Sequence, residues 1–301
     1  MTTDATRASS STAAPATVAP APGRPALEIA VTSAAGAVTA CEGGADRVEL
    51  CSALELGGVT PSQGLVEAAV ATGVPVHALV RCRPGGFTYD ADELDVMVRE
   101  IRALVRSGVA GVVVGALRED GSLDVDAVRW FVDAALDAAA APHQGVRPPE
   151  VAETPVRARG SRQLPGVSSL EVTVHRAVDR AADPVASVAG LAGLGVTRVL
   201  TSGGSSTVGA GLATGMLPRM IEVAGDVQVM AGGGVQLGDV PALVAAGVDA
   251  VHLSAKRARA ARASSSRPGS VVSLGTEAST DSWFETDPDL VRAARHALDH
   301  V

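Results

Sequence analysis

Eight short runs rich in Val, Leu and Ile recur along the 301 residues of this chain, and helix-like stretches separate most of them. The runs span 27–31, 47–51, 74–81, 111–117, 170–176, 198–202, 227–233 and 250–255. Their length and β-branched content indicate strands, and alternation of strand and helix is typical of parallel βαβ units. Eight such units predict an α/β fold of the closed (β/α)8 TIM-barrel type, which carries its functional residues at the C-terminal ends of its strands.

Four of the intervening stretches have a clear helical pattern: 91–107, 124–140, 183–194 and 287–300. Asp90 stands before the first of them, and Asp183 and Asp287 each precede a proline at the start of another. Asp at the N-cap and Pro at the first helical position are typical helix starts. These positions therefore predict where three of the outer helices begin.

One barrel domain is expected over 26–301. Residues 1–25 are rich in Ser, Thr, Ala and Pro without an apolar core, which predicts a disordered tail and not a signal peptide. Residues 141–168 carry five prolines and no periodicity, so we expect a flexible insertion before the fifth strand, on the N-terminal face. The stretch 256–286 is irregular and begins with several basic residues; a mobile, solvated loop is favoured there over an anion clamp.

The net charge of −8 argues against general affinity for nucleic acid or for acidic membranes, although small anions can bind where arginines converge. Lys256 is the only lysine. Three cysteines do not make a disulfide framework, and no apolar stretch approaches the roughly 20 residues of a membrane helix. We expect a cytoplasmic protein with a small-molecule partner. A homo-oligomer stays open.

Parity along the strands predicts which residues face the interior, because alternate residues point to opposite sides and the helix-facing side must be apolar. The predicted interior residues are Glu28, Glu49, Cys51, His77, Arg81, Thr173, His175, Gln228, Met230, Gly232, His252 and Ser254. Barrel interiors are usually filled by bulky aliphatic side chains, and burying charges without partners costs several kcal/mol each. The charged members must therefore be paired with one another, hydrated or bound to a ligand.

Two interpretations of this polar interior remain open. A purely structural network would pair Glu28 and Glu49 with Arg81 and the histidines. In the functional interpretation, a carboxylate and a histidine transfer protons while arginines hold an anionic substrate. The candidate catalytic residues are then Glu28, Glu49 and His175, and the candidate substrate-binding residues are His77, Arg81, Arg83, Arg176, Asp179, Ser202, Gly232, Gly233 and Ser254.

Glycine-rich turns follow two of the strands. Ser202-Gly203-Gly204 follows the sixth run and Gly232-Gly233-Gly234 ends the seventh, before a predicted helix. Backbone N–H groups at such a helix start can bind an anion, and barrels that handle phosphate esters often place the phosphate after strands 7 and 8. The alternative is a tight turn that merely needs glycine. Ser254 at the next strand end favours anion binding.

Several ordered blocks resemble one family. ADRVELC with GGVTPSQG, VRCRPGGFTYD, GALREDGSLD, VTVHRAVDRAADP, RVLTSGG, MAGGGV and HLSA are similar to segments of the CutC family, the copper homeostasis proteins. The resemblance spans about residues 26 to 300 outside the 141–168 insertion. It implies a cytoplasmic (β/α)8 barrel linked to copper homeostasis and described as copper-binding.

The chain departs from that family where copper ligands are concerned. Members often carry cysteine just after the first strand's glutamate, where this chain has Ala30 and Val31. Of the thiols usually considered for copper, Cys51 remains, and we name it as the candidate metal ligand. Cu(I) prefers soft ligands, so a single sulfur makes a weak site. Cys82 ends the third strand, but parity turns it out of the interior.

Three functions are therefore carried forward. The first is a cytosolic copper homeostasis protein that binds Cu(I) through Cys51, with His77 or His175 as helpers. The second is a TIM-barrel enzyme of the lyase or isomerase type that acts on a small anionic or phosphorylated metabolite at the C-terminal face; imine chemistry at Lys256 is disfavoured. The third is a non-catalytic binder or scaffold with a structural charge network.

Overall fold

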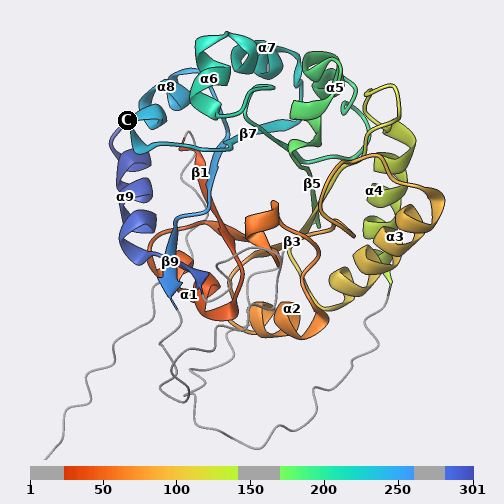
Figure 1. Cartoon of the computed structure of the whole chain (residues 1–301), viewed down its shortest axis with the longest axis horizontal. Coiled ribbons are helices and arrows are strands. Elements are labelled where there is room, and N and C mark those ends of the chain that lie inside the picture. Colours follow the sequence, from red (N-terminus) through yellow and green to blue (C-terminus); the bar gives the residue numbers. More distant parts are fainter. Residues whose placement is uncertain (1–23, 142–169, 261–281) are drawn as a thin grey trace, which may run out of the picture.

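A closed barrel of parallel strands forms the centre of the computed structural model, which describes residues 24–141, 170–260 and 282–301. The barrel strands are β1 (Ala26–Val31), β2 (Arg47–Leu50), β3 (Val76–Leu79), β4 (Gly111–Val114), β5 (Glu171–Val174), β6 (Arg198–Thr201), β7 (Gln228–Gly232) and β8 (Ala250–Leu253). Each strand pairs with the next in sequence, and β8 pairs with β1 to close the ring (Figure 1). All eight predicted strands and the predicted (β/α)8 fold are confirmed.

Helices surround the barrel (Figure 1). They are α1 (Ala34–Glu42), α2 (Gln63–Val70), α3 (Ala91–Arg106), α4 (Val125–Ala140), α5 (Pro184–Ala189), α6 (Val208–Ala213), α7 (Met216–Val223), α8 (Val240–Ala245) and α9 (Pro288–Asp299), with short 3-10 turns η1 (Leu54–Leu56), η2 (Arg176–Arg180) and η3 (Leu237–Asp239). No helix in the described parts of the chain combines the length and the apolar character that crossing a membrane requires.

The predicted helix starts are confirmed by their caps. The Asp90 side chain accepts a hydrogen bond from the Glu93 amide, and the Glu93 side chain accepts one from the Asp90 amide, which makes a reciprocal capping box. Asp183 and Asp287 likewise accept amide hydrogen bonds in front of a proline. The helix predicted over 183–194 is shorter than expected, because α5 ends at Ala189.

The main hydrophobic core lies between the strands and the helices. Outward-facing strand residues such as Ile29 and Val48 are fully buried there, together with Ile101 of α3 and Phe131 of α4. Burying such side chains contributes about 1.5–3 kcal/mol each, so this shell stabilises the barrel without using its interior. The interior is thereby free to carry polar groups.

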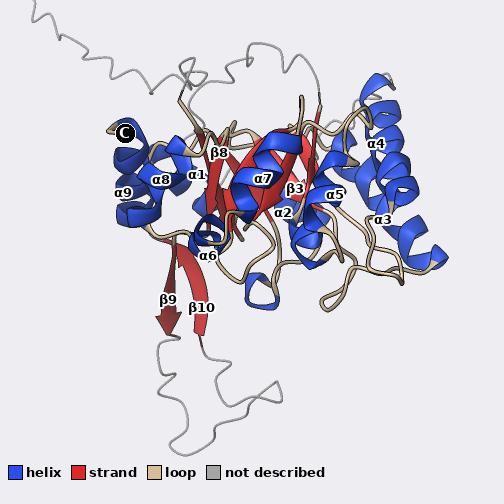
Figure 2. Ribbon diagram, turned by 90° about the horizontal axis from the view of Figure 1, so that it is seen from above, coloured by secondary structure: helices blue, strands red, loops and turns tan. Residues whose placement is uncertain are grey.

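The stretch 256–286 is not irregular throughout, contrary to expectation. Strand β9 (Lys256–Ala260) pairs antiparallel with β10 (Ser282–Thr286), and Lys256 lies opposite Thr286. The hairpin continues directly from β8 and projects beyond the C-terminal end of the barrel (Figure 2). Arg257 and Arg259 alternate with Ala258 and Ala260, a period of two that is typical of a strand.

The predicted insertion 141–168 and tail 1–25 lie almost wholly outside the described residues. Arg24 is an exception within the tail. Its guanidinium binds Asp299 of α9 at 2.8 Å and Asp46 at 3.3 Å. The end of the predicted tail is therefore tied to the barrel.

Candidate functional site

The polar side chains predicted to face the interior are buried. Glu28 is fully enclosed, and Glu49, His77 and His175 are each at most 7% exposed. Neighbouring strands β1, β2 and β3 carry the first three, with Glu49 directly opposite His77, and His175 follows the end of β5. The predicted parity is confirmed for these residues.

Strand β4 provides space for the imidazole rings of its neighbours. A Cβ atom on Gly111 would lie 3.1 Å from the His77 ring, and one on Gly115 would lie 2.7 Å from the His175 ring. A side chain at Gly115 would displace the His175 ring, and one at Gly111 would meet the Glu171 carbonyl oxygen at 2.7 Å as well as the His77 ring. The rings of His77 and His175 therefore occupy the space that side chains at positions 111 and 115 would otherwise fill.

Glu28 is held by cations on both sides. Arg47 donates to its Oε2 at 2.6 Å, and His252 Nδ1 lies 2.8 Å from its Oε1. Burial alone would raise the pKa of Glu28, but Arg47 and the hydrogen bond from His252 hold that pKa well below its usual range. Glu28 is thus an ionised, fully engaged carboxylate, which does not suit the general-base role predicted for it.

A second ion pair lies further toward the N-terminal end of the barrel. Arg198 contacts Glu171 at 2.9 Å and donates to Gln228 at 2.7 Å. His77 Nε2 lies 3.5 Å from Glu171, and burial lowers the pKa of His77 to about 4. His77 is therefore a neutral member of this network of buried polar groups.

Sequence reasoning missed three members of this network: Arg47, Glu171 and Arg198. The signal was present, because Arg47 and Glu171 stand two residues before the predicted interior positions 49 and 173. Arg198 begins the sixth run. Extending the alternation by one step would have identified all three.

Glu49 differs from Glu28 in its partners. Its Oε2 is buried without a hydrogen-bond partner among the described residues, and the nearest cation is His252 Nδ1 at 3.7 Å. Burial raises the pKa of Glu49 to about 7, with His252 opposing and Glu28 adding to the shift. The ligand atoms of Glu28, Glu49 and His252 all lie within 4.8 Å of one another. This cluster is the one described group of side chains spaced to hold a metal ion.

Arg81 does not pair with the glutamates as the structural interpretation predicted. Its guanidinium donates to the carbonyl oxygens of Gly58 at 2.8 Å and Gly85 at 2.9 Å, and its Cζ lies 5.1 Å from the centre of the Phe87 ring. The loops after β2 and β3 therefore close around this side chain. It carries a buried positive charge that no carboxylate of the described residues neutralises.

His175 lies against the other side of Phe87, with ring centres 4.9 Å apart. Its Nδ1 accepts from the Ala177 amide at 3.2 Å, and its buried Nε2 has no partner among the described residues. Burial, reinforced by Arg81, lowers the pKa of His175 to about 4. A neutral ring that accepts at Nδ1 carries its proton on Nε2, so an unused donor faces the interior.

Asp179 occupies the turn after β6 that was predicted to bind an anion. Its carboxylate accepts from the amides of Ser202 and Gly204 at 2.9 Å and from the Thr201 hydroxyl at 2.5 Å. Arg176 Nε donates to it at 2.8 Å. The amides that were expected to hold an external anion therefore hold the Asp179 carboxylate in this structure, and the substrate-binding role of Asp179 and Ser202 stays a prediction.

The turn after β7 packs closely against its neighbours. Gly233 has a φ of +97°, and a Cβ there would lie 2.6 Å from the Arg176 Cζ. Gly232 is equally close-packed, against Leu200. Helix α8 begins only at Val240, after η3, so these glycines do not lead straight into a helix. Gly233 makes room for the Arg176 guanidinium, and Gly232 makes room for the Leu200 side chain.

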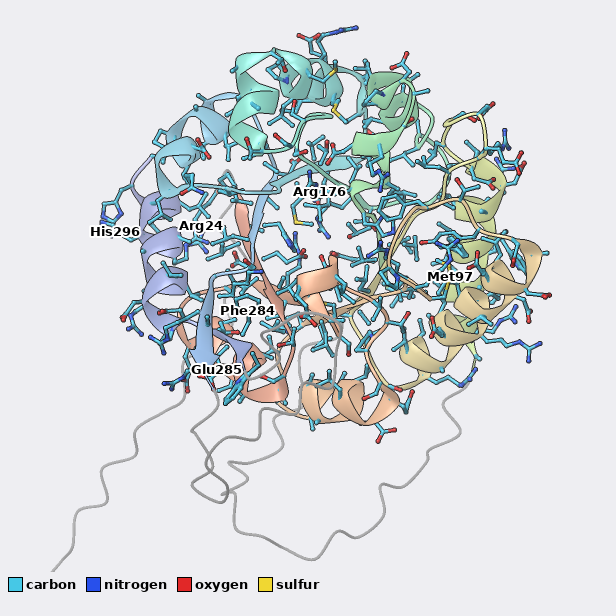
Figure 3. The ribbon with its side chains drawn as sticks, viewed as in Figure 1. Arg24, Met97, Arg176, Phe284, Glu285 and His296 are labelled. Carbon is cyan, nitrogen blue, oxygen red and sulfur yellow. The ribbon has the colours of Figure 1, made fainter. Side chains whose placement is uncertain are left out.

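A pocket of about 540 Å³ opens at the C-terminal ends of β7, β8 and β1. Its lining residues are Ala30, Leu54, Arg176, Gly233, Gly234, Val235, Gln236, Leu237, His252, Leu253, Ser254, Ala255, Lys256 and Leu290. The ionisable residues of this lining are Arg176, Lys256 and His252, and it includes no carboxylate. Figure 3 shows Arg176 inside the ring of helices.

The predicted anion contacts thus divide. Arg176, Gly233 and Ser254 line the pocket, whereas Arg83 lies outside it and forms an ion pair with Glu93 of α3. Ala255, also in the lining, has a φ of +37°, which is uncommon for a residue with a Cβ. Backbone strain of this kind clusters at functional sites.

The surroundings of Cys51 do not fit Cu(I). Cys51 packs with Leu79, Val113 and Leu54, and burial together with Glu49 raises the pKa of its thiol. Cys82 packs instead against the outer core, as parity predicted. Cu(I) binds thiolates and thioethers, and the Cys51 cluster offers one protonated sulfur among aliphatic groups.

The closed parallel barrel, with its charged interior and its pocket at the C-terminal face, defines a TIM-barrel protein. A model of the CutC family matches residues 26–146 and 161–257. A CutC family protein of Xylella fastidiosa (strain Temecula1) is 37% identical over 80% of this chain and 79% of its own length, and one of Rhizobium meliloti is 35% identical over 91% and 96%. The chain belongs to the CutC family.

Solved structures agree on the fold. A CutC protein of Streptococcus agalactiae, to which copper homeostasis is attributed, has a TM-score of 0.60 at 24% identity over 76% of this chain and 98% of its own. KGPDC from Streptococcus mutans has a TM-score of 0.53 at 13% identity over 92% and 99%. These likenesses concern the barrel architecture.

Proposed function

We propose that this CutC family barrel binds a small anionic, phosphorylated metabolite in the pocket at its C-terminal face, and that it acts on this ligand as a lyase or isomerase. The observation that carries the proposal is the convergence of Arg176 and Lys256 on a pocket whose lining includes no carboxylate. Barrels of this type hold phosphate groups at the same face.

Arg176 is preorganised for such a ligand. Its Nε binds Asp179 and its Nη2 donates to Ser202 at 2.7 Å, while its Nη1 makes no hydrogen bond to a described residue. A guanidinium fixed on two sides loses little side-chain entropy when the third nitrogen binds an anion. Asp179 and the glycine turn at Gly233 therefore support binding by positioning Arg176.

His175 is the group that best suits a chemical role among the three predicted catalytic residues. Its neutral imidazole carries a buried Nε2–H that has no hydrogen-bond partner among the described residues. Preorganised donors of this kind stabilise an oxyanion as it develops in a lyase or isomerase reaction. Glu28 is a weak base by comparison, because Arg47 and His252 each hydrogen bond to one of its oxygens and hold its pKa low.

Phosphate binding tests this proposal directly. Millimolar inorganic phosphate should raise the melting temperature of the wild-type protein, and Arg176→Ala should weaken phosphate binding by about tenfold, the loss expected for one charge-assisted contact. Arg83→Ala is the matched control, because Arg83 lies outside the pocket. Equal weakening by both variants, or no phosphate effect on the wild type, would show that the pocket is not an anion site.

Copper homeostasis is a second candidate function, suggested by the family. In this candidate function Cys51 would bind Cu(I), but the aliphatic surroundings of the Cys51 thiol argue against Cu(I) binding there. A Cu(I) titration against a chelator, with wild type and Cys51→Ala, separates the two candidates. Competition by the wild type that is lost in the variant would favour the copper role.

We place the protein in the cytoplasm, since all three cysteines are free thiols, as a reducing compartment keeps them. Association between copies stays a prediction, to be checked by light scattering across protein concentrations. Neither point alters the anion-pocket proposal.

A further inference from the structure

We propose that Glu28, Glu49 and His252 form a binding site for a divalent first-row cation such as Mn²⁺ or Zn²⁺. This site lies inside the barrel and does not depend on the anion pocket. The role it gives Glu28 and Glu49 replaces the proton-transfer role that the sequence suggested for them.

The three residues come from neighbouring strands. β8 pairs with β1, which places His252 opposite Glu28, and β1 pairs with β2, which places Glu49 opposite Ala30, two residues after Glu28. One ligand atom of each residue lies within 4.8 Å of the other two. Because rigid strands hold all three, the donors are already close to the separations that one ion requires.

Glu49 is the less well compensated carboxylate of the cluster, because its nearest cation, His252 Nδ1 at 3.7 Å, forms its hydrogen bond with Glu28 instead. Arg47 binds Glu28 at 2.6 Å and makes no such contact with Glu49. The Glu49 Oε2 atom is buried without a hydrogen-bond donor among the described residues, and the residue is only 7% exposed. A poorly compensated buried carboxylate is costly, and a divalent cation between Glu49, Glu28 and His252 would supply the missing positive charge.

The donor set selects the kind of metal. Two carboxylate oxygens and one imidazole nitrogen suit Mn²⁺ or Zn²⁺, and they do not suit Cu(I), which prefers sulfur. Three protein ligands also leave coordination positions open. His252 lines the anion pocket as well as this cluster, so those positions would lie beside a bound anion.

Surface histidines need to be removed before the site is tested. His296 and His300 lie one turn apart on and just beyond α9, with ring centres 3.9 Å apart, and such a pair can bind transition metals by itself. All measurements should therefore use the His296→Ala/His300→Ala background. Two variants are then compared in it: Glu49→Gln, which removes the less well compensated charge, and Glu100→Gln, which removes a half-buried carboxyl of α3 that hydrogen bonds to Thr60 outside the barrel.

Mn²⁺ titration followed by electron paramagnetic resonance is the direct measurement, after purification with a chelator and dialysis. We expect one ion per chain in the background protein and in Glu100→Gln, and at least tenfold weaker binding in Glu49→Gln. Mn²⁺ should raise the melting temperature of the first two proteins and leave that of Glu49→Gln unchanged. Absence of Mn²⁺ and Zn²⁺ binding to the background protein, or equal affinity in Glu49→Gln, would overturn the proposal.

A second readout covers the case in which Glu49→Gln fails to fold. Electron spin echo modulation of the Mn²⁺-loaded background protein should show coupling to one imidazole nitrogen, and no such coupling would overturn the assignment of His252. Arg176→Ala should bind Mn²⁺ like the background protein. Failure of the metal site and failure of the anion pocket are therefore distinguishable.

Discussion

Asp179 and Glu49 are both buried carboxylates of the same barrel, yet their surroundings are opposite. Asp179 accepts hydrogen bonds from two amides, two hydroxyls and one guanidinium, so its lone pairs are used within the protein. Glu49 has a buried oxygen with no donor among the described residues. The difference teaches that the satisfaction of a buried charge, more than its burial, separates a structural carboxylate from one that is available to a ligand.

Removing Asp179 should have the largest effect. Asp179→Ala leaves Arg176 and the amides of Ser202 and Gly204 without their acceptor, and the donors left unsatisfied cost about 1–3 kcal/mol each where they are buried. Urea unfolding measures this loss. Asp183→Ala, which removes only a helix cap, should cost about 1 kcal/mol. Equal costs would mean that the hydrogen bonds of Asp179 do not stabilise the fold.

Acid should weaken the protein through His175. Its folded pKa is about 4, below the value of about 6.5 expected in the unfolded chain, so the unfolded chain takes up the proton first as the pH falls. Stability is then lost between about pH 6.5 and 4, by up to about 3 kcal/mol for this group. Unfolding free energies measured across that range should fall less steeply in His175→Asn. Parallel curves for the two proteins would assign the acid loss to other groups, such as His77.

Gly233→Ala tests the link between the position of Arg176 and the pocket. The added Cβ meets the Arg176 guanidinium at a positive φ, so we expect a loss of about 1–2 kcal/mol in stability and about tenfold in phosphate affinity. Calorimetry gives both values. Gly238→Ala is the control, since a Cβ there meets no atom within 4 Å. If Gly233→Ala bound phosphate as tightly as the wild type, the position of Arg176 would not determine phosphate binding in the pocket.

Removing the Glu49 charge should have the smallest effect on stability. In the presence of a chelator, Glu49→Gln should unfold within about 1 kcal/mol of the wild type or be more stable, because no buried partner loses its hydrogen bond. Urea unfolding under the same conditions as for Asp179→Ala makes the comparison direct. If Glu49→Gln lowered the free energy of unfolding as much as Asp179→Ala does, Glu49 would be a carboxylate that stabilises the fold, as Asp179 is.

The sequence was sufficient to predict the barrel and the direction of its interior side chains. Alternation depends only on the strand and its apolar face, so it correctly assigns Glu28, Glu49 and His175 to the interior. Alternation does not say which charges meet. Glu28 meets Arg47 and His252 because of the register of three strands, two of which are more than 200 residues apart in sequence.

The loops were harder to predict for a related reason. Asp179 reaches from η2 into the turn after β6, and nothing in its local sequence identifies Ser202 and Gly204 as its partners. Arg81 meets carbonyl oxygens of two loops, which carry no side-chain signal. Contacts that depend on backbone groups of distant turns leave no residue-type pattern to find.

The glycines at positions 111 and 115 have an evolutionary consequence. Because Gly111 and Gly115 give their space to His77 and His175, the volume at each level of the barrel is shared by two positions. A larger residue at position 115 fits only with a smaller one at 175. Position 111 differs, because a Cβ there would also lie 2.7 Å from the Glu171 carbonyl oxygen, which no change at 77 removes. Among relatives, size at positions 115 and 175 should therefore vary in opposite directions, and position 111 should stay glycine whatever residue stands at 77.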